Sequence, residues 1–179
     1  MNYYNEIKNK IINNEIYSRV KDYSKERHKV ITYFEIGKLL NEAGGKYGDN
    51  VIDEYSKKLI VEVGKKYNRR TLFRMKQLYN LFSFIGSEYS IKIGDRNYYI
   101  DLLLFNIKYN CYVVVELKVT EFKVEYISQV QKYMNYIDKN IKEVSNNDTI
   151  GIIICKRENK FVIEYCSDER IAVRVYELV

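Results

Sequence analysis

Two neighbouring apolar segments that each carry a carboxylate constrain the fold of this chain most strongly. The first segment is Asn97–Phe105, which surrounds a lone Asp101, and the second is Tyr112–Lys118, which contains Glu116 near its end. Runs this rich in β-branched, aromatic and leucine residues are typical of buried strands. A buried carboxylate without a partner loses its hydration, so each acid needs a compensating group. The sequence therefore predicts two strands whose acids are stabilised by a specific partner.

The residue types in these strands indicate which partner. Side chains alternate along a strand, so Glu116 and Lys118 share one face and Leu117 points to the other. If the oxygens of Asp101 and Glu116 converge, they form a site suited to Mg²⁺ or Mn²⁺. Phosphodiester hydrolysis needs charge neutralisation, an activated water and a cation near the phosphate, and metal-binding acids beside a lysine supply all three.

A helix predicted after the second strand adds to this pattern. The segment Glu121–Lys139 has helical spacing, and Gln129 and Tyr133 lie four residues apart on one of its faces. The order Asp, Glu-x-Lys and Gln-x-x-x-Tyr over strand, strand and helix is more specific than any of its parts. The alternative is that Glu116 and Lys118 form only an ion pair at a sheet edge.

This order of residues resembles the core of the PD-(D/E)XK nuclease superfamily. More closely, residues 84–179 resemble the nuclease domain of the bacterial DUF1016 (YhcG-like) proteins, and residues 1–83 resemble the amino-terminal helical domain of that family. The matching words are Tyr99-Ile-Asp101-Leu-Leu, Val115-Glu-Leu-Lys118, Glu121-Phe-Lys123, Glu125-Tyr126, Gln129, Ile150-Gly-Ile-Ile-Ile-Cys155-Lys, Tyr33-Phe-Glu-Ile-Gly37, Tyr47-Gly48 and Arg69-Arg-Thr-Leu-Phe-Arg-Met75.

The resemblance implies a fold and a set of roles. The fold is α+β, with a helix-turn-helix-like, DNA-binding bundle before a mixed-sheet, restriction endonuclease-like core. Asp101 and Glu116 would hold Mg²⁺ or Mn²⁺ with the help of the Leu117 carbonyl. Lys118 would orient the attacking water or stabilise developing charge. Gln129 would position water or phosphate, and the reaction would be metal-dependent hydrolysis of DNA.

The chain departs from the family in the segment between its two parts, which is usually longer. Nucleases of this superfamily commonly begin with a helix that carries a further acid near the metal, whereas residues 71–87 contain no Asp or Glu. Glu88 is the nearby candidate for a third acid. Three alternatives stay open. Glu88 substitutes for that acid, the site has two acids only, or the chain is a catalytically degenerate relative that acts as a non-enzymatic DNA-binding or protein-interaction module.

Charge is unevenly distributed between the two parts. Residues 1–86 hold 17 Lys and Arg against 10 Asp and Glu, whereas residues 87–179 hold 13 against 14. A basic front part suits a nucleic-acid contact. Asn68 before two arginines is a good helix start, and the basic residues of the first turns are where recognition helices meet DNA. The expected DNA contacts are Arg69, Arg70, Arg74 and Lys76. The alternative is that lysine-rich helices simply have solvated faces.

The periodicity of apolar residues predicts further elements. Helices are expected over residues 5–13, 16–43, 49–65 and 121–139 and after Asn68, with Gly44-Gly45 ending the second. Strands are expected near residues 89–93, 98–105, 111–118, 150–156, 161–165 and 172–176.

Composition excludes several classes of protein. No run of eighteen apolar residues occurs, and the first residues lack a signal-peptide core, so neither a membrane span nor secretion is expected. Three cysteines without a C-x-x-C pair predict a reduced cytoplasmic protein with no disulfide framework and no zinc site. With His28 as the only histidine, a histidine-dependent triad has no basis. DNA is the expected partner, and a homo-oligomer is compatible with the sequence.

Overall fold

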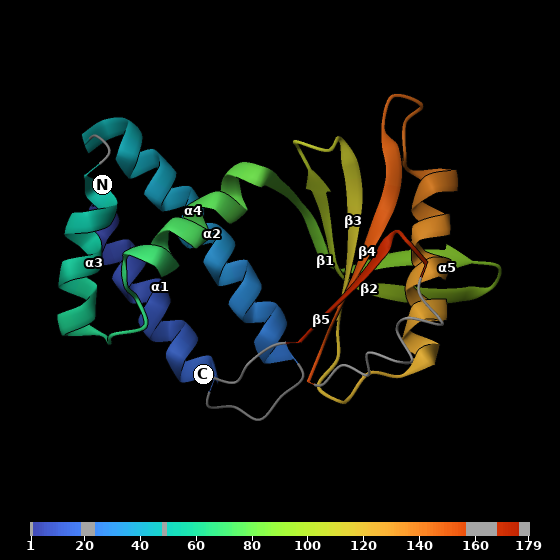
Figure 1. Ribbon diagram of the computed structural model, residues 1–179, viewed down its shortest axis with the longest axis horizontal. Helices are drawn as coiled ribbons and strands as arrows, with labels where there is room; N and C mark the ends of the chain where they lie inside the picture. Colours follow the sequence, from blue (N-terminus) through green and yellow to red (C-terminus); the bar gives the residue numbers. More distant parts are fainter. Residues whose placement is uncertain (1, 19–23, 48–49, 157–167, 176–179) are drawn as a thin grey trace. The chain divides into compact units, whose positions relative to one another are not determined.

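The computed structural model describes residues 2–18, 24–47, 50–156 and 168–175. The chain divides into two compact units, Met1–Phe82 and Ser83–Val179. Four helices precede a mixed five-stranded sheet with one further helix, which confirms the predicted α+β class (Figure 1).

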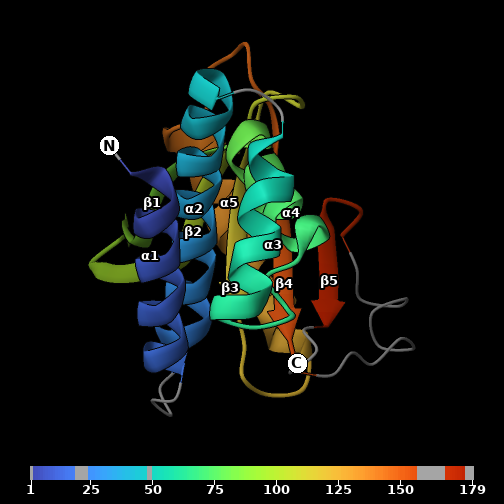
Figure 2. The same cartoon turned by 90° about the vertical axis from the view of Figure 1, so that its left-hand side faces the viewer.

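The helical unit is built on amphipathic helices around one apolar core. Its elements are α1 (Tyr3–Ser18), α2 (Ser24–Tyr47), α3 (Val51–Glu62) and α4 (Arg69–Leu81). Apolar residues recur at helical spacing, for example Ile7 and Ile11 on α1 and Ile36 and Leu40 on α2, and these side chains are buried. Figure 1 and Figure 2 show α1 and α2 running side by side, and the buried apolar residues of the four helices form one core.

Two expectations about the second helix are corrected by the structure. The predicted helix over residues 16–43 is divided, because α1 continues to Ser18 and α2 begins at Ser24. The Ser18 hydroxyl donates a hydrogen bond to the Glu15 carbonyl at 2.8 Å and so takes up a carbonyl at the end of α1. In addition, α2 does not stop at Gly44-Gly45 but runs to Tyr47. Glycine disfavours a helix by only about 1 kcal/mol, which the packing of the preceding turns offsets.

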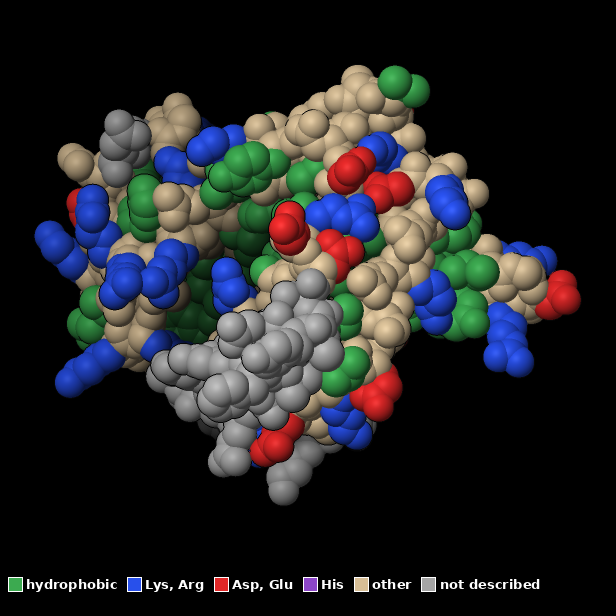
Figure 3. Space-filling model, turned by 45° about the vertical axis from the view of Figure 1, so that its right-hand side comes forward, with side chains coloured by type: hydrophobic (Ala, Val, Ile, Leu, Met, Phe, Trp, Pro, Cys, Tyr) green, Lys and Arg blue, Asp and Glu red, His purple; other side chains and the backbone are tan. Residues whose placement is uncertain are grey.

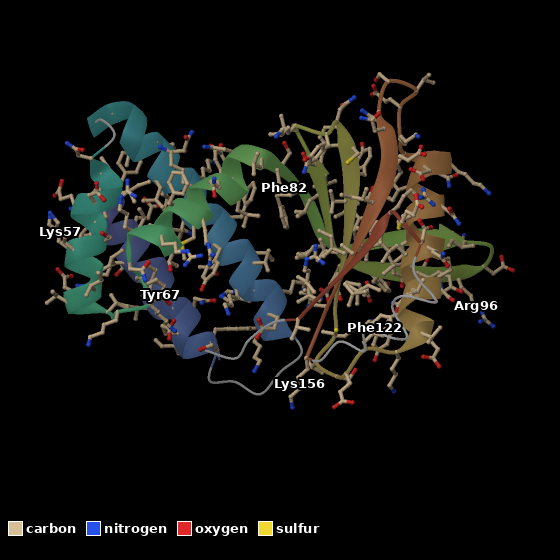
Figure 4. The ribbon with its side chains drawn as sticks, in the orientation of Figure 1. Lys57, Tyr67, Phe82, Arg96, Phe122 and Lys156 are labelled. Carbon is tan, nitrogen blue, oxygen red and sulfur yellow. The ribbon has the colours of Figure 1, made fainter. Side chains whose placement is uncertain are left out.

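The connection from α3 to α4 is held by specific polar contacts. Asn68 caps α4 as predicted, with its Oδ1 accepting a hydrogen bond from the Thr71 N–H at 3.1 Å. The preceding residue, Tyr67, is buried and its hydroxyl donates to the Glu15 carboxylate of α1 (Tyr67 is labelled in Figure 4). Lys66 also pairs with Glu15, at 2.7 Å. These contacts tie the turn to the first helix.

The described part of the second unit forms a sheet of five strands in the order β1-β2-β3-β4-β5. The strand bounds are Phe82–Ile93, Arg96–Asn106, Cys111–Leu117, Asn147–Cys155 and Ile171–Val175. Strands β2 and β3 are antiparallel, whereas β3, β4 and β5 are mutually parallel. The parallel step from β3 to β4 requires a crossover, and α5 (Val124–Asn140) supplies it along one face of the sheet (Figure 1).

Strand β1 is longer than the sequence predicts. It begins at Phe82, directly after α4 ends at Leu81, rather than near Tyr89. The alternation of half-buried Phe82 and Phe84 with exposed Ser83 explains the added length, since period-2 burial is typical of a strand. The predicted strand over residues 161–165 lies outside the described residues.

The sheet and α5 enclose the core of this unit. A Cβ atom added at Gly151 would lie 2.4 Å from Val130 Cγ1 and 2.8 Å from Met134 Sδ, so glycine allows α5 to approach β4 closely. Cys111 and Cys155 are buried free thiols. Within the described ranges, no helix is both long and apolar enough to cross a membrane.

Candidate functional site

The predicted acids lie where the antiparallel β2–β3 ladder ends. Its last registered pair is Leu102 with Val115, and the next step would place Asp101 opposite Glu116. Here the Leu117 N–H donates a hydrogen bond to the Asp101 side chain, with Oδ2 at 2.8 Å. The Asp101 carboxylate thus takes the place of a β2 backbone carbonyl as the acceptor. The two acids therefore share the end of the ladder.

Glu116 is a buried member of the site, with 3% of its surface exposed. Its Oε1 accepts hydrogen bonds from Lys118 Nζ at 2.7 Å and from Gln129 Nε2 at 2.8 Å. Within the part of the chain that the structure describes, Glu116 Oε2 is buried and has no hydrogen-bond partner. A buried carboxylate oxygen without a partner is costly, so this atom indicates a site for a cation or a donor.

The electrostatics of Glu116 support the same conclusion. Burial raises the pKa of the Glu116 carboxyl, and the nearby charge of Asp101 raises it further, against the opposing effect of Lys118. The two carboxylates thus lie close enough to repel one another, and a single lysine does not compensate both. Their oxygens could hold a hard divalent cation, which would supply the missing positive charge.

Lys118 directly follows the last residue of β3, and several groups hold its ammonium. Besides its bond to Glu116, Lys118 Nζ donates to Gln129 Oε1 at 3.1 Å. The same nitrogen lies 4.9 Å from the centroid of the Tyr126 ring, within the range of a cation–π interaction. Glu116 and Lys118 therefore lie on one face, as strand alternation predicts.

One face of α5 completes the site. Tyr126, Gln129 and Tyr133 follow the i, i+3, i+7 spacing of a helical stripe. Gln129 Nε2 donates to the Tyr133 hydroxyl at 3.0 Å as well as to Glu116, so its amide is oriented from two sides. The sequence interpretation did not include Tyr126 among the site residues. Its position three residues before Gln129 is the signal that could have identified it.

The Leu117 carbonyl is a further candidate ligand. In an extended strand the N–H and C=O of one residue point to the same side. The Leu117 N–H points to Asp101 on β2, whereas the next N–H, that of Lys118, donates to Ile154 on β4 at 2.8 Å. Strand geometry thus directs the Leu117 carbonyl toward the side of Asp101.

Glu88 does not join the two acids in a cluster. It is exposed on β1 and has a positive φ of 48°, which is uncommon for a residue with a side chain. Among the residues with described positions, no group of three or more His, Cys, Asp or Glu side chains could hold a metal ion. Glu88 is therefore not placed as a third acid beside Asp101 and Glu116.

The candidate DNA contacts belong to the helical unit. Arg69, Arg70 and Arg74 are exposed on α4, and Arg69 pairs with Asp53 of α3 at 2.5 Å. Lys76 is half-buried, and its Nζ would lie 3.2 Å from a Cβ atom added at Gly44. Figure 3 shows several Lys and Arg side chains gathered on the helical unit. Arg70 and Arg74 are therefore better placed for a ligand than Arg69 or Lys76.

Comparison with known proteins places these features in a family. Residues 55–179 match the YhcG PDDEXK nuclease domain. "Putative nuclease YhcG" of Escherichia coli (strain K12) is 31% identical over 81 residues, which are 45% of this chain and 22% of that protein. The chain thus spans less than a quarter of the length of this relative.

Two solved structures are also similar. A repair endonuclease from Pyrococcus abyssi is 20% identical with a TM-score of 0.41, covering 60% of this chain and 44% of that one. A chain of the EndoMS–dsDNA2 complex is 19% identical with a TM-score of 0.39, covering 54% of this chain and 36% of that one.

Proposed function

Because the chain belongs to the YhcG PDDEXK nuclease domain family, we propose that it is a metal-dependent endonuclease that hydrolyses phosphodiester bonds in DNA. The observation that carries the proposal is the shared position of Asp101 and Glu116 at the end of the β2–β3 ladder, with Lys118 on the same face. The buried, unpartnered Oε2 of Glu116 supports a bound Mg²⁺ or Mn²⁺.

The two acids and a backbone carbonyl form the proposed metal-binding part of the site. Asp101, Glu116 and the Leu117 carbonyl would hold the metal, which when bound neutralises phosphate charge and lowers the pKa of a water. The Leu117 N–H fixes Asp101 by its hydrogen bond, so this ligand is oriented before any ion arrives. Burial of Glu116 limits the access of water to its unpartnered oxygen, Oε2.

The contacts of Lys118 indicate the form in which its side chain would act. Its nitrogen donates to two oxygens and lies over an aromatic ring, and all three contacts suit an ammonium rather than a neutral amine. Orienting the attacking water and stabilising the negative charge that develops on the phosphate both suit an ammonium, and we assign Lys118 to the second, because this role uses its positive charge directly. Gln129 would position the Lys118 ammonium and a water or phosphate oxygen through its amide.

DNA is the proposed partner of the whole chain. We assign residues 1–83 to DNA binding and residues 84–179 to the nuclease reaction, because the front part is basic and exposes Arg70 and Arg74. The buried free thiols of Cys111 and Cys155 suit a reducing compartment, so we place the protein in the cytoplasm. A homo-oligomer is compatible with this assignment.

Cleavage of supercoiled plasmid DNA tests the proposed function. We expect nicked and linear products with Mg²⁺ or Mn²⁺ and none with EDTA. Asp101→Asn and Lys118→Ala should both abolish the products, whereas Lys108→Ala, an exposed lysine in the turn after β2, should cleave as wild type does. Full activity of Lys118→Ala would contradict the proposed role of this residue.

A second candidate function rests on the two-acid composition of the site. A degenerate relative would bind DNA or protein without cutting, with Asp101, Glu116 and Lys118 as a structural cluster. The cluster of three or more candidate ligands that many metal sites use is absent among the described residues, which favours weaker metal binding. Titration of the protein with Mn²⁺ by calorimetry separates the two functions. No heat of binding and no cleavage, with DNA affinity retained, would establish the non-enzymatic function.

A further inference from the structure

A groove of about 490 Å³ follows the face of α5 that is turned away from the core. Ile93, at the end of β1, bounds it on one side, and the other lining residues come from α5. Among them are Ser128, Lys132, Asn135 and Lys139, which recur at helical spacing along one stripe of the helix. The groove is thus a continuous surface of a single helix beside the β1–β2 hairpin.

The chemistry of the lining is suited to phosphate. Two lysines and several hydroxyl and amide side chains line the groove, and no Asp or Glu is among the lining residues. Lys, Ser, Asn and Gln side chains are among the groups that contact the phosphates and sugars of nucleic acids. Ile93 and Tyr136 are the lining residues with a large apolar body.

Some of the polar groups of the groove are available for a ligand, whereas Asn140 Nδ2 donates to the Tyr136 carbonyl at 2.9 Å and Gln131 bonds to Asp168. In the described part of the chain, the side chains of Ser128, Asn135 and Lys139 have no hydrogen bond or ion pair with the protein. Lys132 Nζ lies 3.7 Å from the centroid of the Tyr98 ring and 5.4 Å from that of Tyr133. Two aromatic rings therefore hold this ammonium in place without neutralising its charge.

The groove and the candidate site occupy two faces of the same helix. Gln129, which bonds Glu116, is the residue after Ser128, and Tyr133, which bonds Gln129, is the residue after Lys132. From Ser128 to Lys139 the helix rises about 16 Å, since each residue adds about 1.5 Å. This length corresponds to about five base pairs of duplex DNA at 3.4 Å each. The groove is therefore long enough to follow several successive phosphates of one DNA strand.

We propose that this groove binds the phosphate backbone of duplex DNA and so positions the substrate of the proposed nuclease. The inference rests on the proposed function for its choice of ligand, because lysines alone would also attract an acidic protein. Binding in the groove does not depend on the metal site, so it can be tested without cleavage.

The test measures the binding of a fluorescently labelled DNA duplex to the full chain in EDTA at several salt concentrations. The Lys132→Gln/Lys139→Gln double variant should bind more weakly than wild type. Its slope of log affinity against log salt should be smaller by about 2, because each lysine that contacts a phosphate releases about one counterion. Lys108→Gln removes a charge from an exposed lysine outside the groove and should leave the duplex affinity and the slope close to wild type. A double variant that behaves like this control overturns the proposal.

Two further variants guard against loss of fold. Lys132 contacts two aromatic rings, so the double variant is first compared with wild type by circular dichroism. If it is unfolded, Lys139→Gln alone should lower the slope by about 1. Asn135→Asp should weaken binding further, because it puts a carboxylate in the groove. Unchanged binding by both single variants overturns the proposal.

The experiments distinguish a groove that does not bind DNA from a protein that is not a nuclease. A wild type that does not cleave while the groove variants lose DNA affinity refutes the nuclease and supports the groove. A wild type that cleaves while the groove variants bind and cleave equally well refutes the groove alone. Acetylation of lysines gives an independent readout, since duplex DNA should protect Lys132 and Lys139 and leave Lys108 reactive.

Discussion

Asp101 Oδ2 accepts a hydrogen bond from the backbone N–H of Leu117, 2.8 Å away on the neighbouring strand. The Asp101 side chain thus occupies the position at which the β2–β3 ladder would otherwise continue with a carbonyl. The Asp101 carboxylate therefore has two roles: it accepts a structural hydrogen bond, and it is a candidate metal ligand. Because the bond comes from the residue next to Glu116, it also sets the spacing between the two acids.

Substitutions at Asp101 should separate these two tasks. Asparagine keeps an oxygen that accepts from the Leu117 N–H but loses the negative charge, so Asp101→Asn should fold normally and lose metal affinity by about 100-fold or more. Asp101→Ala loses the acceptor as well, and leaving the Leu117 N–H unsatisfied should cost about 1–3 kcal/mol in the free energy of unfolding. Chemical denaturation and Mn²⁺ titration of both variants measure the two effects. Equal stability of both variants would show that the hydrogen bond contributes nothing.

The stability of the metal-free protein should depend on the charge of Glu116. Burial, and then the charge of Asp101, raises the pKa of this carboxyl in the folded state above its unfolded value of 4.5. The folded protein therefore binds more protons than the unfolded chain at pH values between the two, and stability falls as pH rises through that window. Below the unfolded pKa this loss is absent.

Glu116→Gln should remove this dependence. In EDTA the variant and wild type should differ least below about pH 4.5, and the variant should become relatively more stable as pH rises above it. Glutamine still accepts from Lys118 Nζ, so the comparison isolates the charge. Urea unfolding at a series of pH values measures the difference. A constant difference at all pH values would mean that Glu116 titrates normally.

The sequence alone predicted the elements with strong periodicity and the residues that share a face. The two acid-bearing strands and the helix that carries Gln129 occur within a few residues of their expected bounds, and Asn68 caps α4. Alternation along a strand was enough to place Glu116 beside Lys118, because that relation is local.

Relations that depend on tertiary packing were not predictable in this way. The early start of β1 at Phe82 and the continuation of α2 past Gly44 arise because packing overrides local preference. The Asp101–Leu117 bond requires the register of two strands, and Tyr126 reaches Lys118 only because α5 crosses over the sheet. The separation of Glu88 from the two acids likewise depends on the path of β1.

Tyr126 should act as a positioning residue for Lys118. Replacing the ring by Tyr126→Leu removes a cation–π contact worth about 0.5–2 kcal/mol, so cleavage should slow by about 2- to 30-fold. Tyr126→Phe keeps the ring and loses only the contact between the hydroxyl and Thr120 Oγ1, so it is the matched control. Single-turnover cleavage rates with saturating metal measure the effect, and a pH profile separates it from a folding defect. Identical rates in the leucine and phenylalanine variants would remove Tyr126 from the site.

Gly37 should be essential for the close approach of α2 and α4. A Cβ atom at this position would lie 2.1 Å from the Met75 carbonyl oxygen, which is backbone and cannot move away cheaply. Gly37→Ala should therefore destabilise the protein by about 1–3 kcal/mol, as overpacked cores do. Gly45→Ala is the control, because a Cβ there meets nothing within 4 Å and alanine favours the helix by up to about 1 kcal/mol. Thermal unfolding should shift in opposite directions for the two variants.

Arginines of α4 should determine the salt dependence of DNA binding if the helical unit contacts DNA. Arg70 and Arg74 are exposed, whereas Arg69 already pairs with Asp53, so the double variant Arg70→Ala/Arg74→Ala is the informative one. Its slope of log affinity against log salt should be smaller by about 2 than that of wild type, with weaker binding to any sequence. Lys57→Ala changes an exposed lysine of α3 and serves as the control (Figure 4). Binding of duplex DNA in EDTA measures both. If the double variant matches the control, these arginines form a solvated surface, and the DNA contacts of the chain must come from its second unit.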